Sequence, residues 1–72
     1  MPHVIVKLWP GRTEKQKHAL AARITASLKE TINASDSSIS IAIEEVQELE
    51  WKDKVYGPEI MAKKDILYKE PE

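Results

Sequence analysis

The 72-residue sequence contains no cysteine and only two histidines, His3 and His18. The absence of cysteine excludes disulfide bonds and thiolate metal sites, and the two histidines form no recognisable ligand spacing. A chain of this length buries only about 60% of its unfolded surface, so small proteins commonly depend on disulfides, a metal or self-association. Because the first two supports are lacking, we expect a single domain over residues 1–72 that is stabilised by oligomerisation.

The sequence also lacks an excess of one charge and a long apolar run. Its 11 basic and 12 acidic residues are interspersed and give a formal net charge of −1. This balance provides no electrostatic footprint for nucleic acid or an anionic membrane. No apolar stretch approaches the ~18 residues that a membrane span needs, and residues 1–9 do not have the pattern of a signal peptide. We therefore expect a cytoplasmic protein with no nucleic-acid or membrane partner.

Hydrophobic periodicity predicts two β-strands and one long helix. In residues 2–9, PHVIVKLW, apolar side chains occupy both faces, which is typical of a strand covered on both sides. Thr13 begins a capping box, TEKQ, and apolar residues at four-residue steps then predict a helix that ends at about Ile32. The stretch SISIAIEEV alternates isoleucine with small or polar residues, which predicts the second strand.

The order of strand, long helix and strand predicts a βαβ unit with parallel strands and a right-handed crossover. A turn region around Trp51 and a short C-terminal helix in PEIMAKKDIL, with Pro58 at its first position, are expected to follow. The predicted fold class is therefore α+β. Such a unit leaves one sheet face and both edges open, and it is not stable alone in water. We expect copies of the chain to complete the fold and to share any active site between subunits.

Pro2 is the candidate catalytic residue. A proline directly behind the initiating methionine can simply begin a strand, because the first residue of a strand tolerates the missing N–H. If Met1 is removed, Pro2 instead carries a free secondary amine whose position is fixed by its ring and by the strand. A general base works best when its pKa lies near the operating pH, and burial together with a nearby cation such as Arg12 lowers the pKa of an amine.

A proline that opens the first strand, the GR dipeptide that closes it and the βαβ order together resemble the 4-oxalocrotonate tautomerase family over residues 2–51. MPH at the start and DSSISIA in the second strand are most similar to the small bacterial PptA-type branch, whose members resemble phenylpyruvate tautomerases. The resemblance implies the tautomerase β-α-β fold and catalysis by Pro2. It also implies substrate-binding positions at Arg12 and Trp51, and neither a metal nor another cofactor.

Each candidate binding residue also has a purely structural interpretation. Arg12 is either a turn residue before the helix or a guanidinium that holds a substrate carboxylate in a bidentate fork. Trp51 suits a core, an interface or an apolar wall of the site. Ser40 stands where the best-known family members carry a second arginine, which argues against dicarboxylate substrates; it either donates a hydrogen bond to a carbonyl oxygen or is a plain strand position. His3 points to the face opposite Pro2 and is interpreted as structural or solvated.

The leading interpretation is a cofactor-independent enol–keto tautomerase that acts on 2-keto acids. Arg12 would anchor the carboxylate, and Pro2 would take a proton from the enol hydroxyl and return it to carbon. An aryl pyruvate such as phenylpyruvate is favoured, because one arginine matches one carboxylate and Trp51 suits a ring. The alternatives are a non-catalytic self-assembling domain of the same fold, or a hydratase- or dehalogenase-like enzyme that uses protonated Pro2 as an acid. A homodimer is favoured, with a hexamer as the alternative.

Overall fold

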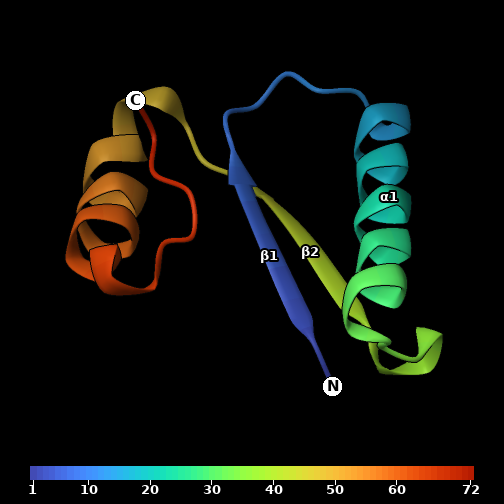
Figure 1. Ribbon diagram of the computed structural model, residues 1–72. Helices are drawn as coiled ribbons and strands as arrows, with labels where there is room; N and C mark the ends of the chain where they lie inside the picture. Colours follow the sequence, from blue (N-terminus) through green and yellow to red (C-terminus); the bar gives the residue numbers. More distant parts are fainter.

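The computed structural model describes the whole chain and contains the predicted βαβ unit (Figure 1). Its main elements are β1 (His3–Leu8), α1 (Glu14–Ile32) and β2 (Ser40–Glu45). The two strands form a parallel pair whose register runs from His3 opposite Ser40 to Leu8 opposite Glu45. The predictions of an α+β fold, of parallel strands and of a single intervening helix are therefore confirmed.

Helix α1 begins and ends as its sequence signals predict. The Gln16 N–H donates to Thr13 Oγ1 at 3.1 Å, and the Thr13 N–H donates to Gln16 Oε1 at 2.8 Å. This capping box satisfies backbone donors that a helix start leaves unpaired. At the other end Asn33 adopts the left-handed conformation, with φ of 55°, which ends the helix before the short 3₁₀ turn η1 (Asp36–Ser38). Neither α1 nor any other helix has both the length and the apolar character that crossing a membrane requires.

An ion-paired lysine connects the start of α1 to the end of β2. Lys17 Nζ lies 2.7 Å from Glu14 Oε2 and 3.3 Å from Glu45 Oε2. The hydrogen bonds that Lys17 donates to Glu14 and Glu45 raise the pKa of Lys17, and the bond to Glu14 lowers the pKa of that carboxyl. The helix is thereby held against the strand by charge as well as by its apolar side chains.

The two faces of the sheet are covered by different parts of the chain. Figure 1 shows α1 on one side of the strands and the C-terminal segment on the other. Ile41 and Ile43 of β2 lie against Ala21 of α1 and are half-buried on that face. Ile5 points to the opposite face, where the C-terminal segment covers the sheet only in part, and its side chain is 54% exposed. The second face is therefore the less protected one.

The predicted short C-terminal helix is present, but the C-terminal segment contains more helical structure than the predicted turn followed by one short helix. It consists of a 3₁₀ turn η2 (Glu48–Glu50), a wide π-type helix η3 (Lys52–Ile60) and a 3₁₀ helix η4 (Met61–Ile66). Trp51 has helical backbone angles and joins η2 to η3. The prediction of a turn region around Trp51 was therefore wrong, because helical structure begins well before the expected residue.

Pro58 explains both the error and the unusual helix. The prediction placed Pro58 at the first position of a helix, whereas it lies inside η3. Proline lacks an N–H, and in an α-helix its ring clashes with the carbonyl four residues earlier. The wider turn of a π-type helix is compatible with the ring, and the Met61 N–H closes the helix by donating to the carbonyls of Tyr56 and Gly57.

Very little of the chain is buried. Only Val46 and Val55 are buried, each with 5% of its surface exposed; Val46 directly follows β2, and Val55 lines a cavity with Ile5 on the face that the C-terminal segment covers. Several large apolar side chains remain open, including Leu20, Ile32, Leu49 and Ile66. A chain that removes so little apolar surface from water gains little hydrophobic stabilisation by itself. This exposure favours the expected self-association.

Candidate active site

An open cleft of about 300 Å³ lies at the C-terminal end of β1. It is lined by Lys7, Leu8, Trp9, Arg12 and Trp51. Trp9 and Trp51 pack edge to face, with ring centroids 6.4 Å apart and an interplanar angle of 88°. Two cationic side chains therefore lie beside two indole rings, and this combination suits an organic anion that carries an aromatic group.

The turn after β1 places Arg12 at the cleft. Gly11 has φ of 126°, a backbone conformation that other residues rarely adopt. Immediately after Arg12, Thr13 caps α1 through its hydrogen bonds with Gln16. The arginine is thus fixed between a glycine turn and a capped helix, and its guanidinium has no carboxylate within ion-pairing distance.

Lys7, the second cation of the cleft, is already occupied by a carboxylate. Its ammonium forms an ion pair and a hydrogen bond with Glu59 Oε2, which comes from η3. Both side chains are partly sheltered, with 25% and 35% exposed respectively. The hydrogen bond to Glu59 raises the pKa of Lys7, so its charge is held firmly. Arg12 is therefore the only unpaired cation in the cleft.

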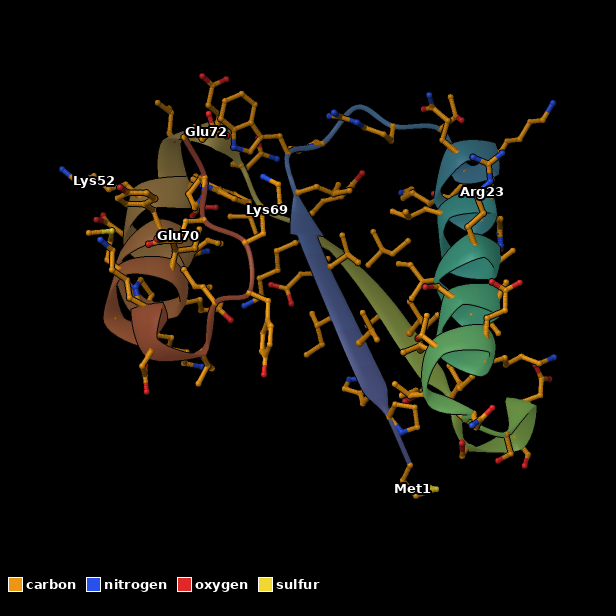
Figure 2. All side chains as sticks on the ribbon, viewed as in Figure 1. Met1, Arg23, Lys52, Lys69, Glu70 and Glu72 are labelled. Carbon is orange, nitrogen blue, oxygen red and sulfur yellow. The ribbon has the colours of Figure 1, made fainter.

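Pro2 and Ser40 lie together at the opposite end of β1. The Ser40 N–H donates to the Pro2 carbonyl at 3.2 Å. Ser40 Oγ lies 2.6 Å from His3 Nδ1, so the histidine interpreted from the sequence as structural or solvated is the partner of a candidate site residue. Pro2 is half-buried, and Met1 extends into solvent from this end of the strand (Figure 2). No group of three or more histidine, aspartate or glutamate side chains is arranged to hold a metal ion.

Strand β1 separates the four predicted site residues into two pairs. Pro2 and Ser40 are at its N-terminal end, and Arg12 and Trp51 are at its C-terminal end. Six strand residues span about 20 Å at about 3.3 Å each. A substrate the size of an aryl pyruvate therefore cannot contact both pairs within one chain. The contact between His3 and Ser40 depends on the register of the parallel pair, which periodicity alone does not specify.

The βαβ fold of the chain agrees with the protein family that its sequence matches. The model of the family described as tautomerase enzyme matches residues 2–55, which include the βαβ unit and all four predicted site residues. The chain belongs to the tautomerase family. The match begins at Pro2, and it ends at Val55, inside η3. Most of the C-terminal segment therefore lies beyond the part that the family model describes.

Individual tautomerases match over greater lengths. Tautomerase PptA of Enterobacter sp. (strain 638) is 43% identical over 72 residues, which cover 99% of this chain and 95% of that protein. A probable tautomerase of Xylella fastidiosa (strain 9a5c) is 38% identical over 71 residues, which cover 99% of this chain and 87% of the relative. The crystal structure of YwhB, a homologue of 4-oxalocrotonate tautomerase, superposes with a TM-score of 0.64 at 42% identity, covering 65% of this chain and 77% of YwhB.

These comparisons establish the resemblance inferred from the sequence, including its PptA-type character. They also identify the chain as an enzyme of the tautomerase type, hence an isomerase, which favours catalysis over the non-catalytic alternative. The alignments with PptA proteins span nearly the whole chain, so they include the C-terminal segment that contains Glu59. This segment is therefore part of the tautomerase and not an unrelated addition.

Proposed function

We propose that the chain catalyses enol–keto tautomerisation of 2-keto acids, with aryl pyruvates such as phenylpyruvate as the favoured substrates and Pro2 as the general base once Met1 is removed. The observation that carries this proposal is the cleft in which Arg12, the unpaired cation, lies beside Trp9 and Trp51. One guanidinium matches one carboxylate, and two indoles offer flat apolar surface to one ring. No cofactor is required for the proton transfer.

The proposed reaction uses the side chains in distinct roles. Arg12 holds the substrate carboxylate with two parallel N–H donors. The Pro2 amine accepts the proton of the enol hydroxyl, the C=C electrons take up a proton at carbon from the resulting ammonium, and the C–O bond becomes the ketone. The amine is regenerated at the end of this cycle. A His3 Nδ1–H that donates to Ser40 Oγ leaves the serine hydroxyl hydrogen available for the forming carbonyl oxygen.

Two observations support Pro2 as the working N-terminus. Met1 is fully exposed and makes no hydrogen bond, so its removal disturbs no packing. The family match begins at Pro2. With Met1 attached, the proline nitrogen is an amide without a usable lone pair; after removal it is a basic secondary amine. The proposed chemistry therefore depends on a processing step that the exposed methionine permits.

We further propose that each site is shared between two chains. Because β1 separates Pro2 from Arg12, a substrate that contacts both must lie between the proline of one chain and the arginine of another. The poorly covered face of the sheet, where Ile5 is 54% exposed, is the surface that a second copy would protect. A homodimer is favoured over a hexamer, because the C-terminal segment already covers part of that face.

Ketonisation of phenylenolpyruvate by intact and N-terminally extended protein tests the role of Pro2. One residue added ahead of Pro2 converts its amine into a tertiary amide. We expect the rate to fall by at least about 10²-fold, the lower range of general-base contributions, while circular dichroism shows an unchanged fold. For the intact enzyme, kcat/KM should decrease as the pH falls below the pKa of the amine, since the base is then protonated.

Mass spectrometry of the intact protein provides the matching control, and we expect Met1 to be absent. Full activity in a protein that retains Met1 would falsify the role of Pro2. A kcat/KM that instead falls as the pH rises through the pKa of the amine would indicate the acid role of the hydratase- or dehalogenase-like alternative.

A further inference from the structure

The cleft that contains Arg12 has a second potential anion site in Lys7, but the Lys7 ammonium is already paired with the Glu59 carboxylate. Lys7 lines the Arg12 cleft and also a neighbouring cavity of about 240 Å³, and Trp51 is part of both walls. Glu59 lines only the second cavity and reaches Lys7 from there. The Glu59 carboxylate that neutralises Lys7 therefore comes from η3 and lies in the neighbouring cavity, which shares Lys7 and Trp51 with the Arg12 cleft.

We propose that Glu59 determines the charge selectivity of the cleft: by occupying Lys7 it leaves Arg12 as one carboxylate site, so that monocarboxylates bind and dicarboxylates gain nothing from their second charge. The proposal rests on the carboxylate-anchoring role of Arg12 given above. Glu59 is a specificity-determining residue in this scheme and does not itself contact the reacting atoms.

The energetics of the pair support this selectivity. A substrate carboxylate that approached Lys7 would have to displace Glu59, or else lie beside it and be repelled. Both side chains are only partly exposed, so solvent screens their attraction less than that of a surface pair. The hydrogen bond from Lys7 to Glu59 raises the pKa of the ammonium.

The C-terminal segment places Glu59 for this contact. Glu59 directly follows Pro58 in η3, and the same element contributes the buried Val55, which is 5% exposed. The lysine and the glutamate are 52 positions apart, so the pair is a tertiary contact between β1 and η3. Glu59 also lies beyond residue 55, where the family model ends. The selectivity device is thus built from a part of the chain that the general family description does not include.

Tryptophan fluorescence provides a direct binding measurement, because Trp9 and Trp51, the two tryptophans of the chain, both line the cleft. The probes are phenylacetate and 1,4-phenylenediacetate, which share a ring and differ by one carboxylate. For the unaltered protein we expect similar Kd values for the two probes. In Glu59→Gln the freed Lys7 should tighten binding of the dicarboxylate by about tenfold more than that of the monocarboxylate, the effect of one added charge-assisted hydrogen bond.

Three variants control for general effects. Glu70→Gln removes the same charge from a residue that follows η4 and is paired with Lys64, and it should leave both Kd values unchanged. Glu59→Asp retains the carboxylate and should retain the original selectivity. In Lys7→Met/Glu59→Gln the gain should disappear, because the freed cation is absent.

A folded Glu59→Gln protein without a selective gain for the dicarboxylate overturns the proposal. Should that variant not fold, Lys7→Met supplies a second test. It leaves an unpaired carboxylate beside the cleft, so the dicarboxylate should bind several-fold more weakly while the monocarboxylate changes less; equal changes for both probes overturn the proposal. These binding measurements are independent of turnover. If the unaltered protein shows the expected charge selectivity but no tautomerase activity, only the proposed catalytic role of Pro2 is contradicted. If Arg12→Ala binds the monocarboxylate as tightly as the unaltered protein does, the anchoring role of Arg12 is contradicted.

Discussion

At the scale of single residues, the position of Arg12 is fixed by its two neighbours. Gly11 supplies the positive φ that turns the chain out of β1, and Thr13 begins α1 through its capping box. The side chain is exposed at the mouth of the cleft and has no carboxylate partner in the chain. Its guanidinium is therefore available to a ligand without the loss of an existing ion pair.

We expect Arg12→Ala to act mainly on the KM of carboxylate substrates. The loss of a charge-assisted hydrogen-bonded contact costs about 1.5–3 kcal/mol, so KM should rise by at least about tenfold. Arg12→Lys should recover only part of the affinity, because an ammonium cannot form the bidentate fork. Steady-state kinetics with phenylenolpyruvate measures this effect. An uncharged enol substrate that loses as much as the carboxylate would count against the anchoring role.

At the scale of elements, the βαβ unit could be predicted because its signals are local. The capping box at Thr13 and the alternating isoleucines of β2 each act within a few residues, and the structure contains both elements close to the expected bounds. A short C-terminal helix was also predicted, but its extent and the helical structure before it could not be predicted in the same way. Gly57 and Pro58 together are typical of a turn, whereas packing of Val55 retains a wide helix through them.

The candidate site was predictable as a set of residues and not as an arrangement. The family resemblance identifies Pro2 and Arg12, but the length of β1 determines that they lie at opposite ends of one strand. Lys7 and Glu59 carried no signal in the sequence, because their contact spans 52 positions and depends on the path of η3. Tertiary contacts of this kind follow from the packed structure alone.

The ion pairs at the start of α1 lead to a pH dependence of stability. The hydrogen bond from Lys17 lowers the pKa of Glu14 below its ordinary value of 4.5. A carboxyl with a lowered folded-state pKa contributes stability above its unfolded-state pKa and loses that contribution as the pH falls through the folded-state value. We therefore expect Glu14→Gln to lower the Tm slightly at neutral pH, and the difference from the original protein to close on acidification below pH 4.5.

Thermal unfolding followed by circular dichroism across this pH range measures the effect. The Glu14 side chain is 79% exposed, so the difference in Tm should be small. In a protein that carries Lys17→Met, the change in Tm caused by Glu14→Gln at neutral pH should be smaller still, because Glu14 then has no lysine partner to lose. A difference in Tm that widens on acidification would contradict the assigned direction of the pKa shift.

At the scale of the whole molecule, the chain leaves much of its apolar surface uncovered. Only two of its residues, Val46 and Val55, are buried, while Ile32 and Ile66 are 59% and 62% exposed. The candidate site is also incomplete within one chain, because Pro2 and Arg12 lie too far apart to contact one substrate. Stability and catalysis are therefore expected to depend on the same association between copies.

The separation of Pro2 from Arg12 along β1 also means that two impaired proteins should complement each other when the substrate concentration lies well below KM. One variant carries an extra residue ahead of Pro2, and the other carries Arg12→Ala. When their chains exchange at random, about one site in four pairs a free Pro2 with an intact Arg12, in a dimer and in a hexamer alike. At a substrate concentration well below KM, these sites should therefore supply about a quarter of the original ketonisation rate. A mixture that is no more active than the average of its two components would indicate that Pro2 and Arg12 of the same chain act on one substrate, which would contradict the shared site.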